Sequence, residues 1–381
     1  MLFEPHCYQT QAWVLLSRSF QSGKVAGTYL LYGPEGVGQW PLALAFASLL
    51  NCSDRKLDSP SGVLVPCGKC HSCRAIAGFN SPHLLYAVPL KPKTERKDEK
   101  LDDNAAVLEV LALQKEEPFR LHTHDKQLSI PIELARDIQR RLSLKAEEGA
   151  MRVVVFFEME KMRGDAADSL LKLIEEPPPN TVILLTSANE HALPVTIRSR
   201  SQEIRLRRIP AKIIQEYLQK HKQLSEERAA IVARTSGGSL GRALAIAETD
   251  EDEGFDRNVG FRLFKSLVAD SNAETASHLA DMVSDKDRGQ AEELLYLWQT
   301  LIRDCAGYFA TGDGDCIVNV DFQQEIVHFA PRFSEPSVVS GCAESIKNTL
   351  ADLRRNVHIH GALVALSLSM KGHLAQPSIG R

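Results

Sequence analysis

Four cysteines lie close together in the sequence, at Cys52, Cys67, Cys70 and Cys73. Structural zinc sites hold the metal with four tetrahedral ligands, often thiolates at ~2.3 Å. The tight spacing of the last three supplies several thiols from one turn, and the polar loop before them returns the chain to Cys52. The pattern therefore predicts a structural zinc site, with no open position for catalysis. Free surface thiols or a redox pair are the alternatives.

A glycine-rich segment carries the second chemical pattern. A nucleotide-binding P-loop reads G-x-x-x-x-G-K-[ST], with the lysine on the phosphates and the hydroxyl on magnesium. Gly33, Gly36 and Gly38 fit its glycine positions and the turn between them, but Gln39 stands at the lysine position and Trp40 at the hydroxyl position. Gln39 brings no charge, and an indole cannot ligate a cation. We predict a P-loop fold without hydrolytic chemistry; the alternative is a glycine turn unrelated to any nucleotide.

Acidic residues follow a second apolar run, at 152–157. In nucleotide motors such a strand ends in acidic residues that serve magnesium and activate water. Here Glu158 could ligate a metal, whereas Met159 cannot polarise water. Glu160 could substitute for the missing acid, but a solvated charge is the favoured expectation. This departure points the same way as the changes in the glycine loop.

The segments around these residues alternate between strand and helix patterns. Continuous apolar runs at 29–32, 152–157 and 181–186 are typical of strands buried on both faces of a parallel sheet. Helical patterns at 42–50 and 166–176 lie between them. Alternation of this kind predicts an α/β fold built on a parallel sheet.

Composition narrows the class of protein. A chain of 381 residues has room for two or three domains, and its 44% hydrophobic and 25% charged residues are ordinary for a globular protein. A net charge of −4 argues against a dedicated nucleic-acid binder. No signal peptide and no membrane-spanning run are expected, so a cytoplasmic location is predicted. The other cysteines, Cys7, Cys305, Cys316 and Cys342, are expected to be small core residues.

Several motifs together resemble one family. GPEGVG at 33–38, the cysteine cluster, SLLKLIEEPPPNTVILLTSANE at 169–190 and LPVTIRSRSQEIRL at 193–206 are similar to the delta prime family of clamp-loader subunits of bacterial DNA polymerase III. These are AAA+ proteins. The resemblance covers about 9–241 well and the rest more loosely. The γ/τ subunits share the motifs but keep Lys-Thr in the P-loop, so Gln39 and Trp40 favour delta prime.

The resemblance implies roles for single arginines. In this family an arginine of a Ser-Arg-Cys motif reaches the ATP site of the neighbouring subunit, and the matching residue is Arg200, with Ser201 in place of the cysteine. An exposed surface arginine is the alternative. Arg198 is the weaker candidate and is expected to be a solvated neighbour. Arg242 stands at the sensor-2 position of the lid, where a structural salt bridge is the alternative to a nucleotide contact.

The resemblance also implies a division of the chain. It predicts an AAA+ core over 1–208 that includes the zinc module at 52–73. The charge-rich stretch at 91–126 departs from the shorter family pattern and is expected to be a surface insertion, for which a solvated loop is favoured over a nucleic-acid contact. A helical lid follows at 209–250. A helical collar at 255–375 would join five subunits. Apolar stripes run along two of its helical segments, and a self-contained bundle is the alternative explanation for them. The stripes are Leu294, Leu297, Leu301 and Cys305, and Ile359, Leu363, Leu366 and Met370.

The expected function is that of a non-catalytic clamp-loader subunit with structural zinc. The neighbours would bind ATP, and the partners would be the γ/τ and δ subunits, the sliding clamp and, through the complex, primed DNA, with no membrane contact. An active P-loop ATPase is the alternative, which ATP turnover by the purified chain would distinguish. A zinc-bearing DNA-binding module is disfavoured by the charge balance, and salt-sensitive DNA binding would revive it.

Overall fold

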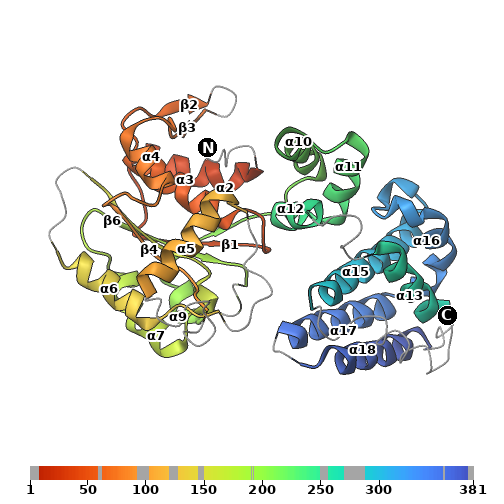
Figure 1. Cartoon of the computed structure of the whole chain (residues 1–381). Coiled ribbons are helices and arrows are strands. Elements are labelled where there is room, and N and C mark those ends of the chain that lie inside the picture. The colour runs from red at the N-terminus through yellow and green to blue at the C-terminus, as the bar shows by residue number, and fades with distance from the viewer. Residues whose placement is uncertain are drawn as a thin grey trace. The chain divides into compact units, whose positions relative to one another are not determined.

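The chain forms two compact units, each with its own hydrophobic core (Figure 1). The first comprises Met1–Ile214 and Gly238–Ala245, and the second Gln215–Gly237 and Ile246–Arg381. The computed structural model describes residues 8–58, 62–91, 103–119, 128–144, 150–189, 191, 193–248, 256–269, 288–354 and 357–375.

A five-stranded sheet forms the centre of the first unit. All its strands run parallel, in the order β4-β5-β6-β1-β7. The bounds are β1 Thr28–Tyr32, β4 Leu84–Ala87, β5 Arg152–Phe156, β6 Thr181–Ser187 and β7 Gln202–Arg205. Every residue of β6 is buried, which requires cover on both faces of the sheet. The predicted α/β class with a parallel sheet is confirmed.

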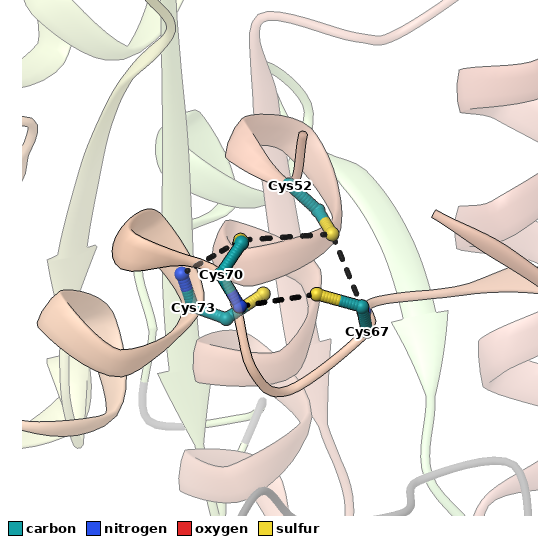
Figure 2. Close-up of side chains that lie close together, drawn as sticks. All are labelled: Cys52, Cys67, Cys70 and Cys73. Atoms are coloured by element: carbon teal, nitrogen blue, oxygen red, sulfur yellow. Dashed lines mark hydrogen bonds between the residues drawn. The ribbon is translucent and has the colours of Figure 1, made fainter. Parts of the chain in front are cut away.

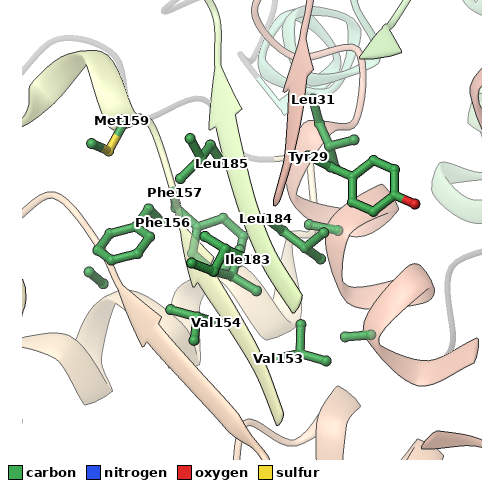
Figure 3. Packing of buried hydrophobic residues seen from close by; sticks show 14 of the residues in the cluster. Tyr29, Leu31, Val153, Val154, Phe156, Phe157, Met159, Ile183, Leu184 and Leu185 are labelled. Carbon is green, nitrogen blue, oxygen red and sulfur yellow. The ribbon is translucent and has the colours of Figure 1, made fainter. Parts of the chain in front are cut away.

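The strands form where the sequence is continuously apolar. Across β5 and β6, Val153 pairs with Val182 on one face and Val154 with Ile183 on the other, so β-branched side chains fill both faces. Figure 3 shows these strands beside β1, with side chains of all three strands in one core. The apolar surface that they bury is the main stabilising contribution to this unit.

Helices surround the sheet. They are α2 Thr10–Gln21, α3 Gln39–Asn51, α4 His71–Ala77, α5 Asp103–Glu116, α6 Ile132–Leu142, η2 Met159–Lys161, α7 Gly164–Ser169, α8 Leu171–Glu175 and α9 Val195–Arg198. Helix α3 follows the glycine loop and is buried along nearly its whole length. The hairpin of β2 (Lys56–Asp58) and β3 (Val63–Val65) is fixed to α2, because Ser17 Oγ accepts from Leu64 N at 2.8 Å and donates to Leu64 O at 3.1 Å.

Two predictions about this unit were wrong in detail. The expected solvated loop at 91–126 contains α5, whose Val107 and Leu111 are buried in the core; 92–102 and 120–126 lie outside the described residues. The expected helix at 166–176 is two short helices. Gln139 Nε2 donates to Ser169 O at 2.9 Å, which draws that carbonyl away from the helical ladder, and Leu170 N bonds Ala167 O instead of continuing it.

The second unit is helical in its described part. Its helices are α10 Ala211–Lys222 and α12 Leu240–Glu248, which extend into both units, α11 Glu226–Thr235, α13 Arg257–Ala269, α15 Arg288–Thr311, η4 Gly314–Cys316, η5 Val320–Phe322, α16 Gln323–Phe329, η6 Ala330–Phe333, α17 Pro336–Arg354 and α18 Ile359–Leu374. None of the helices described combines the length and apolar character that crossing a membrane requires.

The apolar stripes of α15 and α18 pack against the same chain. All eight stripe residues belong to one buried cluster, so they form a self-contained bundle and are explained without a partner subunit. On α15, the buried Asp304 Oδ2 accepts hydrogen bonds from Val318 N, Asn319 N and Asn319 Nδ2 at 3.0, 2.8 and 2.7 Å. These bonds hold the loop that leads into η5. Cys305 and Cys342 are buried as expected, Cys316 is half-buried, and Cys7 lies outside the described residues.

Candidate functional site

The four clustered cysteines converge in space. The sulfur atoms of Cys52, Cys67, Cys70 and Cys73 all lie within 4.8 Å of one another (Figure 2). Tetrahedral zinc with sulfur ligands at ~2.3 Å would separate neighbouring sulfurs by about 3.8 Å. The Sγ atoms of Cys52 and Cys70 are 4.0 Å apart. The donor set and its spacing therefore fit a four-thiolate zinc ion.

Backbone amides point at the sulfur atoms. Cys67 N donates to Cys52 Sγ at 3.3 Å, Cys70 N to Cys67 Sγ at 3.3 Å and Cys73 N to Cys70 Sγ at 3.4 Å. Such donors favour the thiolate over the thiol. Gly68, with φ of 75°, supplies the left-handed turn between two of the ligands. The loop is thus preorganised around negative sulfur.

Burial divides the four thiols into two pairs. Burial raises the pKa of the Cys52 and Cys73 thiols. Burial also opposes ionisation of Cys70, but hydrogen bonds with the backbone of Cys73 and Ser53 lower its pKa to about 6. Metal binding releases the protons of its thiol ligands. A bound cation would therefore compensate for the cost of holding buried thiols as thiolates.

The cysteine cluster lies at the C-terminal end of α3. Cys52 is the residue after that helix, and the Arg55 guanidinium donates to the carbonyls of Leu49 and Leu50 at 2.8 and 2.9 Å. The same guanidinium lies over the Phe20 ring of α2, 4.6 Å from its centroid. The sequence between the first two cysteines therefore caps α3 as well as bringing the ligands together.

The glycine loop joins β1 to α3, as the P-loop pattern predicts. Its lysine position is filled by a residue that turns back on the loop: Gln39 Nε2 donates to Gly33 O and Pro34 O, both at 2.8 Å. Gln39 is buried. An amide cannot neutralise phosphate charge, and here its donors are used within the loop.

Neighbouring segments hold this loop in place. Gln9 Nε2 donates to Val37 O at 3.0 Å and to Arg207 O at 2.7 Å. Gly241 N, near the start of α12, donates to Gly36 O at 3.0 Å. A Cβ atom at Gly33 would lie 2.5 Å from Leu206 O, so only glycine fits there.

Trp40 and Glu158 meet behind the loop. The Trp40 ring stacks on Phe157, with centroids 3.5 Å apart and planes 16° apart. Glu158 adopts a left-handed backbone (φ 52°), which is uncommon outside glycine and marks the turn after β5. Although part of the residue reaches solvent, its carboxyl is enclosed. Burial, then repulsion from Glu160 and Glu35, raises the Glu158 pKa to about 8.

The expectation that Glu160 is a solvated charge was wrong. Glu160 is half-buried, and its Oε1 accepts a hydrogen bond from Ala188 N at 2.8 Å. Burial raises the pKa of its carboxyl, and this hydrogen bond partly offsets the shift. This hydrogen bond links the segment after β5 to the end of β6. It gives a partner to the Ala188 amide, which lies just beyond the strand.

Arg200 lies at the opposite edge of the sheet from the glycine loop. The loop follows the carboxyl end of β1, whereas Arg200 precedes the amino end of β7, which runs parallel to β1. Thr28 Oγ1, at the amino end of β1, donates to Ile174 O at 2.7 Å, and the adjacent Glu175 pairs with Arg200. Five residues of strand, about 16 Å, separate the two places.

The other predicted arginines have partners close by in the chain. Arg198 Nε donates to Glu203 Oε1 at 2.9 Å and is half-buried, so it is an ion-paired residue and not only a solvated neighbour. Arg242 is half-buried on α12, and its backbone N–H donates to Ser239 Oγ at 3.2 Å. Arg242 directly follows Gly241, whose backbone N–H contacts the glycine loop.

Two residues contribute to the site through contacts that the sequence does not predict. Gln9 is an isolated polar residue outside any motif, and its two long-range bonds appear only in the fold. Glu175 belongs to a recognised motif, but its partner Arg200 stands far along the chain. Neither periodicity nor residue spacing predicts such contacts.

The comparisons with known proteins identify the family of this chain. The family described as "DNA polymerase III, delta subunit" matches residues 8–210, and the chain belongs to this family. It is 31% identical to DNA polymerase III subunit delta' of Pseudomonas aeruginosa over 175 residues, 46% of this chain and 41% of that protein. It is 22% identical to subunit delta' of Bacillus subtilis over 369 residues, 95% and 96% of the two chains.

The chain is also similar to other proteins. The chain is 23% identical to DNA polymerase III subunit tau of Bacillus subtilis, over 65% of this chain but 37% of that protein. The chain thus spans less than half of the length of the first curated relatives it matches. Among solved structures, a DNA polymerase III gamma subunit-related protein of Thermotoga maritima matches with a TM-score of 0.37 and 14% identity, over 94% and 99% of the chains.

Zinc content tests the cysteine cluster. Freshly reduced, purified protein should carry close to one zinc ion per chain, because four thiol sulfurs converge there. Cys70→Ser should lose most of the metal and lower the urea midpoint of the first unit. Cys316→Ser, whose thiol lies in the second unit outside the cluster, is the matched control and should keep both. Metal analysis giving less than half an equivalent in the wild type would contradict the site.

The pKa of Glu158 predicts a dependence of stability on pH. The folded chain keeps this carboxyl protonated up to about pH 8, whereas the unfolded chain ionises it near its ordinary value of 4.5. The folded state therefore binds more protons in that window, and its stability falls as pH rises through it. Glu158→Gln removes this loss, so its advantage over wild type should grow with pH, by at most about 1.4 kcal/mol per unit, and level off above pH 8.

Urea unfolding at several pH values measures this difference. A Trp298→Phe background leaves Trp13 and Trp40, both in the first unit, as the fluorescent reporters. Glu109→Gln, an exposed residue of α5, is the control and should run parallel to wild type. Parallel profiles for Glu158→Gln as well would show that the carboxyl ionises normally in the folded chain.

Proposed function

We propose that this chain is a non-catalytic subunit of a DNA polymerase III clamp loader, acting in the cytoplasm. Membership of the family and the similarity to subunit delta' of Bacillus subtilis along nearly both chains support this assignment. The observation that carries the non-catalytic part is the position of Gln39. At the place of the phosphate-binding lysine stands a buried amide whose donors already bond two carbonyls of its own loop.

The residues next to the loop also lack the means to hold magnesium. Trp40 replaces the hydroxyl that would ligate the ion. Glu158, at the carboxyl end of β5, keeps its proton at neutral pH because its pKa is about 8. A neutral carboxyl is a poor ligand for a hard cation, which prefers charged oxygen. ATP is therefore bound and hydrolysed by neighbouring subunits.

Arg200 is the residue that would serve a neighbour. It is exposed, and it lies at the opposite edge of the sheet from the glycine loop of its own chain. An arginine in that position is suited to a site in trans, where a guanidinium stabilises the charge that develops on the transferring phosphoryl group. The γ/τ and δ subunits, the sliding clamp and primed DNA are the partners of such a complex.

The zinc ion has a structural part in this proposal. It would be held by Cys52, Cys67, Cys70 and Cys73, and with four thiolates it has no open position for a substrate. It would fix the end of α3, where Cys52 follows the helix, beside the hairpin of β2 and β3 that Ser17 ties to α2. The helix that begins at the glycine loop is thereby held at both ends.

An active ATPase is the second candidate, because the strand, loop and helix of a P-loop are all present. The two candidates differ in what the purified chain does alone. We expect no phosphate release above background, with or without primed DNA, since the lysine, hydroxyl and acidic positions hold Gln39, Trp40 and Met159. Turnover that disappears in Gln39→Ala would establish the ATPase instead.

Arg200→Ala tests the action in trans. The variant should fold and assemble normally, because Arg200 is exposed and contributes nothing to the core. Complexes reconstituted with it should hydrolyse ATP more slowly at the one adjacent site, so total turnover falls only in part while loading of labelled clamp onto primed DNA slows clearly. Lys172→Ala, an exposed cation on neighbouring α8, is the control. Equal loading rates at limiting ATP would make Arg200 an ordinary surface residue.

A further inference from the structure

The Arg200 side chain is held by one carboxylate. Its Nε donates to Glu175 Oε2 at 2.7 Å, and its Nη1 donates to Thr196 O at 3.1 Å. Its backbone is fixed in the turn after α9, because Arg200 N donates to Ile197 O at 3.2 Å. Contacts within this chain therefore fix both the position and the orientation of the Arg200 guanidinium.

The contacts leave one end of the guanidinium open. Arginine has five N–H donors in a rigid plane. In the described part of the chain, the bonds of Arg200 engage Nε and Nη1, and its Nη2 group has no partner. The side chains of Arg200 and Glu175 are 34% and 54% exposed. An incoming anion could reach Nη2 while Glu175 still holds Nε.

The position of Glu175 is fixed by the chain around it. Pro177 disfavours a helical conformation at Glu176, which has φ of −128° and ψ of 74°, so α8 ends with Glu175 on its last turn. The preceding residue, Ile174, is buried and its carbonyl accepts from Thr28 at the amino end of β1. Glu175 is thus tied to β1, and through it so is Arg200.

We infer that Glu175 is a positioning residue for Arg200: it orders the guanidinium before the neighbouring subunit's phosphate arrives. This inference rests on the proposed function of Arg200. An exposed ion pair contributes little to stability, so Glu175 orients the arginine without withholding it from a more highly charged phosphate. Its benefit is that the ordering of a long side chain is already complete when the complex forms.

The size of the effect follows from that ordering. Immobilising one long side chain corresponds to about a three- to tenfold change in rate. Glu175→Ala should lower the clamp-loading rate of the reconstituted complex by this factor and leave the melting temperature unchanged. Glu175→Gln, which keeps an oxygen acceptor, should recover part of the loss. Glu176→Ala is the matched control, since Glu176 is exposed and the described structure shows no ion pair or hydrogen bond of its side chain.

A double-mutant cycle shows whether Glu175 acts through Arg200. In an Arg200→Ala background, Glu175→Ala should have no further effect. The ratio of wild-type to Glu175→Ala rates should also shrink as salt is raised, because the exposed pair is screened. A role of Glu175 in merely holding α8 would show neither behaviour.

The other outcomes contradict the inference in distinguishable ways. If Arg200→Ala slows loading and Glu175→Ala does not, the role of Glu175 is wrong and the proposed function stands. Faster loading by Glu175→Ala would mean that the carboxylate competes with phosphate. An equal loss in both backgrounds would mean a structural role. If Arg200→Ala has no effect at all, the action in trans fails, and the inference fails with it.

Discussion

The pairing of β1 on both of its edges is the constraint on which the first unit depends. β6 and β7 supply that pairing, and each is preceded by a segment that carries one partner of the Glu175–Arg200 pair. The carboxyl end of β1 leads into the glycine loop and then into α3, whose other end is the first cysteine of the cluster. Features that are separate in the sequence thus lie at the two ends of β1 or at the two ends of α3.

The residues that follow the glycine loop tie it into the core. Without a donor at position 39, the carbonyls of Gly33 and Pro34 would lose these hydrogen bonds, and unsatisfied buried polar groups are costly. Gln39 supplies those donors, Trp40 fills space by stacking on Phe157, and Glu158 avoids a buried charge by keeping its proton. The three residues compensate one another, and a lysine returned alone to position 39 would meet carbonyls but no phosphate.

The sequence predicted what depends on local pattern. The strands of the sheet and the convergence of the cysteines follow from apolar runs and short ligand spacing. It did not predict α5, because the charged residues around it obscured a helix that packs only two of its turns inward. Glu160 was misjudged because its burial depends on how the end of β6 approaches it. The domain boundaries, the role of Arg200 and the bound zinc remain predictions.

The topology of the sheet also bears on how the chain is made. Thr28 pairs with Ile183 and Tyr29 with Gln202, so the ribosome must complete most of the first unit before β1 has a neighbour. At roughly 5–20 residues per second, the delay is on the order of ten seconds, during which the apolar α3 has no sheet to cover it. Cys52 to Cys73, in contrast, emerge together. A metal ion taken up by the nascent chain would give that helix its first fixed end long before the strand it follows finds a partner.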